Sequence, residues 1–191
     1  MRAIAAEARV QPAAIYHHYA SKEEILVSLQ DDFMERLTER VVEALERHQR
    51  PALRLAAAVR EHVVFHGHHT RAAFVTDSEI RALTEAPRAA LIAKRDEYQR
   101  MFSGMIRDGI RDGSLHTPDV HVATYAILLQ CTGVALWFDR SGPLALDQVC
   151  EIHVELVLAS LQASRELIDA AIETVRAVPA GLPGDDLGAG T

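Results

Sequence analysis

Histidines are the residues of this 191-residue chain whose types and spacing best suit chemistry. His62 and His66 lie four residues apart on a predicted helix, and two more histidines follow soon after. Imidazoles at this spacing can share one metal ion, with Glu61 or Asp77 available as a third ligand. Because no cysteine lies near them in the sequence, we predict solvated or hydrogen-bonded histidines at a helix end, with no metal and no cofactor.

The sequence also lacks the common motifs of catalysis. It contains no HExxH, GxSxG, P-loop or GxGxxG pattern. Its two cysteines, Cys131 and Cys150, lie in separate apolar helical patterns without CxxC spacing, so we expect both to be buried, reduced and inert. These observations predict that the protein is not an enzyme.

A different kind of chemistry is suggested by residues 2–29. Two short helical patterns meet at Arg9-Val10, and a capped third helix follows. This order is typical of a helix-turn-helix, whose second helix presents an exposed face to the major groove of DNA. At about 100° per residue, Ile15 and Tyr19 point to one side of that second helix. The opposite side carries Ala13, Ala14, His17 and His18.

The same segment resembles a known family. The match to the TetR family of bacterial one-component repressors runs through IAAEA, AAIYHHY and SKEEIL. The resemblance implies an all-α fold, with an N-terminal helix-turn-helix on a larger helical body for ligand binding and dimerisation. It also implies that Tyr16, His18 and Lys22 contact backbone phosphates of double-stranded DNA. The positions that match the family's base-reading residues are Pro12, Ala13, Ala14 and His17.

Two departures from the family pattern leave two interpretations open. Arg9 stands where the family usually has Gly at the turn, and a non-Gly residue at positive φ costs about 1 kcal/mol. The family also has a further helix before the motif, whereas this sequence begins at Met1 within the motif's first helix. The chain is therefore predicted to be a ligand-responsive repressor that binds a pseudo-palindromic operator as a homodimer. The alternative is a ligand-binding and dimerisation module that has lost DNA binding through a missing N-terminal helix.

The rest of the sequence reads as successive helices without strand alternation. A capping box at Ser21 and Glu24 opens one long helix, Gly113 ends a later one, and Thr117 is the predicted N-cap of the next. We divide the chain into a DNA-binding region with the start of the linking helix (1–40), a ligand-binding and dimerisation domain (41–163), and an extension with a weak helix and a disordered tail (164–191). The predicted body helices span 21–45, 53–65, 74–83, 88–112, 117–138, 145–161 and a weaker stretch to about 178.

Charge and hydropathy bear on partners and location. The net charge is −7, but residues 1–22 carry three basic residues against one acidic residue, so a small DNA-binding footprint remains compatible with an acidic body. Residues 122–138 are uncharged yet short for a bilayer, and we expect a buried helix that is covered on both sides, partly by a second protomer. No signal peptide is apparent, which predicts a cytoplasmic protein outside the membrane.

Part of the body resembles the TetR subgroup that controls fatty-acid and steroid-ring catabolism and responds to acyl-CoA thioesters. The resemblance lies in residues 79–83, Arg88, Arg95, Tyr98 and residues 137–144. An effector of this kind would need an apolar tunnel for the acyl part and arginines for the CoA phosphates. The alternative is that these arginines occupy solvated helix faces and form intrahelical pairs. The predicted ligand-binding residues are Phe65, Phe74, Arg81, Arg88, Arg95, Met101, Met105 and Trp137.

Overall fold

The computed structural model describes residues 11–178, apart from the side chain of Pro12. The turn at Arg9, the motif's first helix and the C-terminal tail after Val178 therefore lie outside the described residues. Every regular element in residues 11–178 is a helix, which confirms the all-α fold class. The elements are α2 (Pro12–His18), α3 (Lys22–Glu46), α4 (Pro51–His68), α5 (Thr70–Ser78), η1 (Glu79–Ala82), α6 (Glu85–Arg111), α7 (Val120–Thr132), α8 (Val134–Trp137), α9 (Leu146–Ser160) and α10 (Arg165–Arg176).

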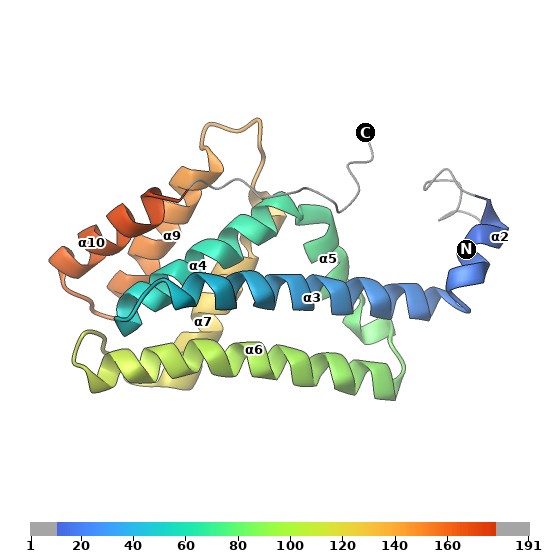
Figure 1. The fold of residues 1–191 in the computed structure, drawn as a ribbon, viewed down its shortest axis with the longest axis horizontal. Coiled ribbons are helices and arrows are strands. Elements are labelled where there is room, and N and C mark those ends of the chain that lie inside the picture. Colours follow the sequence, from blue (N-terminus) through green and yellow to red (C-terminus); the bar gives the residue numbers. More distant parts are fainter. Residues whose placement is uncertain (1–10, 179–191) are drawn as a thin grey trace.

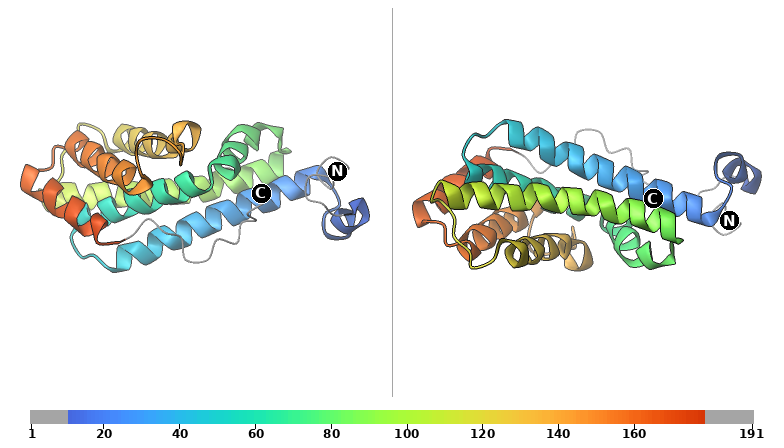
Figure 2. Two further views of the ribbon diagram at one scale, coloured as in Figure 1. Left: turned by 90° about the horizontal axis from the view of Figure 1, so that it is seen from above. Right: turned by 90° about the horizontal axis from the view of Figure 1, so that it is seen from below.

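The molecule is elongated, with α2 at one end and α9 and α10 at the other (Figures 1 and 2). Helix α4 forms the centre of the body and packs against α3, α6, α7, α9 and α10. Its Leu55, Val59 and Val63 have no exposed side-chain surface. A helix that is apolar on several sides is stable only when neighbours cover those sides, so the composition of α4 accounts for its central position.

Helix α3 connects the N-terminal end of the molecule to the body (Figure 1). The predicted capping interaction is confirmed, because the Ser21 hydroxyl accepts a hydrogen bond from the Glu24 N–H at 3.0 Å. The carboxylate of Glu24 in turn accepts from the N–H of Ala20. Farther along the helix, Phe33 and Val41 belong to a buried stripe that packs on the body. One continuous element of 25 residues thus extends from α2 to the core.

The predicted helix over 117–138 is wrong at its start and near its end. Asp119, rather than Thr117, caps α7, because its carboxylate accepts from the Val122 N–H at 2.8 Å. The helix stops at Thr132, and the short α8 begins after Gly133. Because Gly133 has a low helix propensity, the helix is interrupted there although the apolar sequence pattern continues. The end of α6 is as predicted, since Gly113 adopts a φ of 78° after the helix.

The outer face of α7 and α8 is not covered by the described chain. Leu129 and Leu136 are 76% and 73% exposed, and Val122 and Tyr125 are also exposed. The described chain covers this helix on one side only, and the expected covering of the other side by a second protomer stays a prediction. By length and composition alone, residues Val120–Trp137 could cross a membrane, and less than a quarter of this stretch is buried. One such helix is weak evidence, because core helices of soluble proteins can be as long and as apolar.

The segment after residue 164 contributes to the body. Helix α10 begins at the N-cap Ser164 and packs on α4 and α9 through buried side chains that include Leu167 and Val175. Next to it, Arg60 donates to the backbone oxygen of Val178 at 2.7 Å. The guanidinium of Arg60 also pairs with Glu61, a partner that is shared with Arg40. These contacts tie the C-terminal helix to α3 and α4.

Candidate functional site

The predicted DNA-contacting residues lie along α2 and at the first residue of α3, a part of the molecule that we call the reading end. Helix α2 ends at His18, the backbone is extended at Tyr19, and Lys22 is the first residue of α3. Tyr16 is 55% exposed, while Ile15 and Tyr19 are half-buried. The remaining predicted contacts, Ala13, Ala14, His17, His18 and Lys22, are exposed, and the side chain of Pro12 lies outside the description. This end therefore presents an uncovered polar surface with a lysine at its edge.

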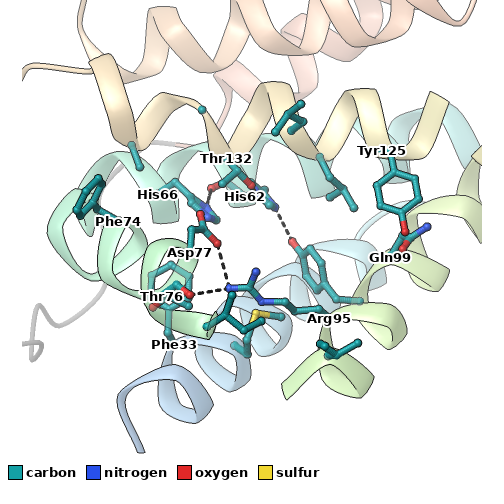
Figure 3. Close-up of a pocket in the computed structure, with 18 of the residues that line it drawn as sticks. Phe33, His62, His66, Phe74, Thr76, Asp77, Arg95, Gln99, Tyr125 and Thr132 are labelled. Carbon is teal, nitrogen blue, oxygen red and sulfur yellow. Dashed lines mark hydrogen bonds and ion pairs between the residues drawn. The ribbon is translucent and has the colours of Figure 1, made fainter. Parts of the chain in front are cut away.

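A second candidate site is a cavity of about 590 Å³ in the body, which is open to the surface where exposed residues such as Leu136 line it. Helices α3 to α8 and η1 contribute to its wall, which is mostly apolar (Figure 3). Its size is in the range of small-molecule sites, about 300–1,000 Å³. The apolar wall includes Phe33, Met34, Phe74, Ile80, Ile92, Leu128 and Leu136. The polar wall includes His62, His66, Thr76, Asp77, Arg95, Tyr98, Gln99 and Thr132.

Two of the predicted ligand-binding residues, Phe74 and Arg95, line this cavity. Phe65 is fully buried against Phe33, with ring centroids 4.9 Å apart. Trp137 is 55% exposed and stacks on His153 instead. Among the other predicted residues, Met101 and Met105 pack in or against the core, and Arg81 and Arg88 are exposed.

Arg95 is held in place at the cavity wall. Its Nη2 donates to the backbone oxygen of Thr76 and to Oδ1 of Asp77, both at 3.0 Å (Figure 3). The carboxylates of Asp77 and Asp96 also line the cavity, so the positive charge of Arg95 is balanced there. An apolar space with internally paired charges favours a ligand whose enclosed part is mostly uncharged.

His62 and His66 are hydrogen-bonded, as predicted, and His66 lies in the last turn of α4, but the side chains of both line the cavity. Each is 3% exposed, and their rings stack with centroids 4.1 Å apart. Burial lowers the pKa of both imidazoles, that of His62 well below its usual range. Both are therefore neutral at pH 7. The i, i+4 spacing indicated that the two histidines share one face of the helix, but it did not indicate that this face lines a buried part of the cavity.

His62 lies between two hydroxyl groups. Its Nδ1 is 2.9 Å from the Tyr98 hydroxyl, and its Nε2 is 3.0 Å from the Thr132 hydroxyl. Burial raises the pKa of Tyr98 well above its usual value, so the phenol keeps its proton. Sequence reasoning did not predict Tyr98 and Thr132 as contacts of His62, because they come from α6 and α7, distant in the chain.

The two acidic residues that were considered as third metal ligands form ion pairs with arginines. Glu61 forms ion pairs with Arg40 and Arg60, and Asp77 pairs with Arg95. Within residues 11–178 there is no group of three side chains suited to hold a metal ion. The cysteines are free and buried as predicted, and burial raises the pKa of the Cys150 thiol to about 12.

Comparison with known proteins gives two family matches. Residues 1–29 match the model of "Bacterial regulatory proteins, tetR family", and residues 48–161 match "Tetracyclin repressor-like, C-terminal domain". The HTH-type transcriptional repressor KstR2 of Mycobacterium tuberculosis is 29% identical over 164 residues, which cover 84% of this chain and 82% of the relative.

Solved structures show the same arrangement. A tetR-family regulatory protein from Rhodococcus RHA1 superposes with a TM-score of 0.79 at 25% identity, over 85% of this chain and 86% of that one. AibR, in complex with isovaleryl coenzyme A and operator DNA, has a TM-score of 0.73 at 23% identity, over 80% and 83% of the two chains. The likeness to AibR concerns the fold alone.

Proposed function

The chain belongs to the TetR family of bacterial regulatory proteins, and from this premise we propose that it is a ligand-responsive transcriptional repressor that binds a pseudo-palindromic operator as a homodimer. One observation carries the proposal. Helix α3 starts at the exposed reading end with Lys22 and contributes Phe33 and Met34 to the cavity wall. A ligand in the cavity therefore contacts the helix that positions the reading end.

On the DNA side, we assign phosphate contacts to Tyr16, His18 and Lys22. These side chains are exposed and belong to one junction between two helices. Phosphate contacts position a protein on the duplex, and base contacts in the groove specify the sequence. We assign base contacts to Pro12, Ala13, Ala14 and His17, where small side chains suit the methyl group of thymine.

The dimer interface is assigned to the uncovered apolar surface of α7, α8 and α9. Leu129 and Leu136 lie on the first two helices, and Ile152 and Leu156, 44% and 52% exposed, lie on the third. Large exposed apolar patches mark a contact with another protein or with a membrane, and we infer that these side chains together form such a contact. A second copy of the chain is the partner that a pseudo-palindromic operator requires, because two reading ends must lie about one turn of DNA apart.

For the effector, we propose an acyl-CoA-like thioester. The mostly apolar cavity suits an acyl group. Arg81 follows the cavity residue Ile80 in sequence, and Arg88 lies four residues before the cavity residue Ile92 on α6. We assign these two exposed arginines to the CoA phosphates. That AibR binds isovaleryl coenzyme A on the same fold agrees with this assignment.

The test begins with selection of bound fragments from genomic DNA, which yields an operator. Anisotropy titrations then measure the operator Kd with and without a panel of acyl-CoAs, free fatty acids and cationic drugs. We expect sequence-specific binding, and at least one acyl-CoA that stabilises the protein and shifts the operator Kd. Specific binding that responds only to cationic drugs would contradict the thioester. Ligand binding without any specific DNA binding would favour the alternative of a module that has lost DNA binding.

A further inference from the structure

We propose that the buried polar part of the cavity binds a hydroxyl group, so that the part of the effector enclosed in the cavity is mainly apolar and carries an uncharged alcohol. The side chains concerned are His62, His66, Tyr98 and Thr132, which we call the hydroxyl subsite. The inference rests on the proposed function in one respect, namely that the cavity is the effector site. The argument follows from which of these groups can donate and which can accept.

His66 supplies an acceptor. Its Nδ1 lies 2.9 Å from the backbone oxygen of His62, and a carbonyl oxygen can only accept, so Nδ1 must carry the proton. In a neutral imidazole the other nitrogen then holds a lone pair. Among the described residues, Nε2 of His66 has no hydrogen-bond partner, although the side chain is 3% exposed and lines the cavity. A ligand donor would fill this position.

The two hydroxyls around His62 supply a donor. A neutral imidazole has one protonated nitrogen and one lone pair, so one hydroxyl accepts from the ring while the other donates to it. The accepting hydroxyl keeps its own proton. If Nδ1 of His62 is protonated, it donates to Tyr98, and the hydroxyl proton of Tyr98 stays free. If Nε2 is protonated, it donates to Thr132, and the hydroxyl proton of Thr132 stays free. In either tautomer the pair retains one proton that the contact with His62 does not use.

The subsite therefore offers one acceptor and one donor, with the rings of His62 and His66 stacked 4.1 Å apart. An alcohol is the matching group, because its proton can go to Nε2 of His66 and its oxygen can accept from Tyr98 or Thr132. A ketone or an ether only accepts and leaves Nε2 desolvated without a partner. A carboxylate brings a negative charge to a cavity already lined by Asp77 and Asp96.

The experiment uses three uncharged probes of similar size: octan-2-ol, octan-2-one and 2-methoxyoctane. Calorimetric titration of the intact protein gives the Kd of each. We expect octan-2-ol to bind roughly two- to tenfold more tightly than the ether or the ketone, which is the effect of one hydrogen bond to a buried group. This preference is measured on the unmodified protein and does not depend on any variant.

His66→Phe keeps an aromatic ring but removes the acceptor, so it should abolish the preference for the alcohol. His153→Phe is the matched control. His153 is also buried on a helix, at 6% exposed, and its Nδ1 contacts the backbone oxygen four residues earlier at 2.7 Å. It does not line the cavity, so its replacement should leave the preference unchanged. Circular dichroism melts establish that both variants are folded.

The outcomes separate this inference from the proposed function. Equal affinity for all three probes in the unmodified protein would overturn the hydroxyl subsite while leaving the cavity as a ligand site. A preference that persists in a folded His66→Phe variant would also overturn it. Absence of binding by every probe would contradict the effector cavity itself, and the hydroxyl subsite with it.

Discussion

Gln30 and Arg95 donate hydrogen bonds to one acceptor, the backbone oxygen of Thr76, at 3.5 and 3.0 Å. Gln30 belongs to α3, which carries the reading end, whereas Arg95 and Thr76 line the cavity. A ligand that displaces Arg95 therefore changes the hydrogen bonding of the group that Gln30 also contacts. This shared carbonyl is a physical connection between the cavity and α3.

The first prediction concerns Gln30→Met. Gln30 is fully buried, and its Oε1 has no partner among the described residues. Removing a desolvated, unpaired oxygen and one long hydrogen bond should raise the free energy of unfolding by about 1 kcal/mol. The same change should reduce the effect of an effector on operator affinity. Urea denaturation and anisotropy measure the two quantities, with the exposed Gln49→Met as control. A destabilised variant with full ligand response would contradict the assignment.

The second prediction compares the chain's two lysines. Lys22→Ala should weaken binding to specific and non-specific DNA by similar factors, because a phosphate contact carries no sequence information. The slope of log K against log salt should fall in magnitude by about 1.8, because a dimer loses two contacts at about 0.9 each. Lys94→Ala is the control, since Lys94 pairs with Asp31 on the body. An unchanged salt slope in Lys22→Ala would exclude this phosphate contact.

The third prediction concerns sequence preference. His17 is exposed on α2 and is assigned to base edges. His17→Ala should change the order of affinities among operators mutated at single positions, with little effect on binding to unrelated DNA. The loss at one base pair should be about 1–3 kcal/mol. Competition titrations over an operator mutant library measure this. A uniform loss across all sequences would assign His17 to the phosphate backbone instead.

The fourth prediction tests the dimer interface. Leu129→Asp should convert the proposed dimer to monomer, because burying a carboxylate in an apolar interface is unfavourable. Leu129 also lines the cavity, so the oligomeric state is the deciding readout. Sedimentation velocity measures the change, and operator affinity should fall with it. Val42→Asp introduces the same charge at an apolar side chain that is 43% exposed on α3, and it should leave the dimer intact. A dimeric Leu129→Asp protein would place the interface elsewhere.

The fifth prediction is a pH dependence of stability. Burial lowers the pKa of His62 and His66 in the folded state below the usual 6.5. The unfolded chain therefore binds these protons first, and the free energy of unfolding should fall as pH decreases below about 6.5, by up to about 1.4 kcal/mol per pH unit for each group. Above that pH the two histidines should have no effect. Urea denaturation between about pH 7.5 and about pH 5.5 measures the slope, which His66→Phe should reduce.

The sequence predicted the helices well where local signals determine them. Ser21 and Glu24 cap α3 as expected, and Gly113 ends α6 at a positive φ. The cavity was harder to predict, because its wall combines residues from helices far apart in the chain. Phe65 and Phe74 were both predicted as aromatic contacts of the ligand, but Phe65 lies in the core, whereas Phe74 lines the cavity. Periodicity indicates which residues share a helix face, but the packing of helices decides what that face meets.

The length of α3 determines how far the reading end moves when a ligand displaces the cavity wall. Phe33 lies about halfway between Lys22 at the reading end and Leu45 at the opposite end of the helix. A rigid rod that turns about its far end moves in proportion to the distance from the pivot, and an α-helix rises about 1.5 Å per residue. A displacement of Phe33 is therefore about doubled at Lys22. If the α3 helices of two protomers turn in opposite senses, the displacements of their two reading ends add. A small change in the shape of the cavity then alters the distance between the reading ends, which no longer matches the helical repeat of DNA.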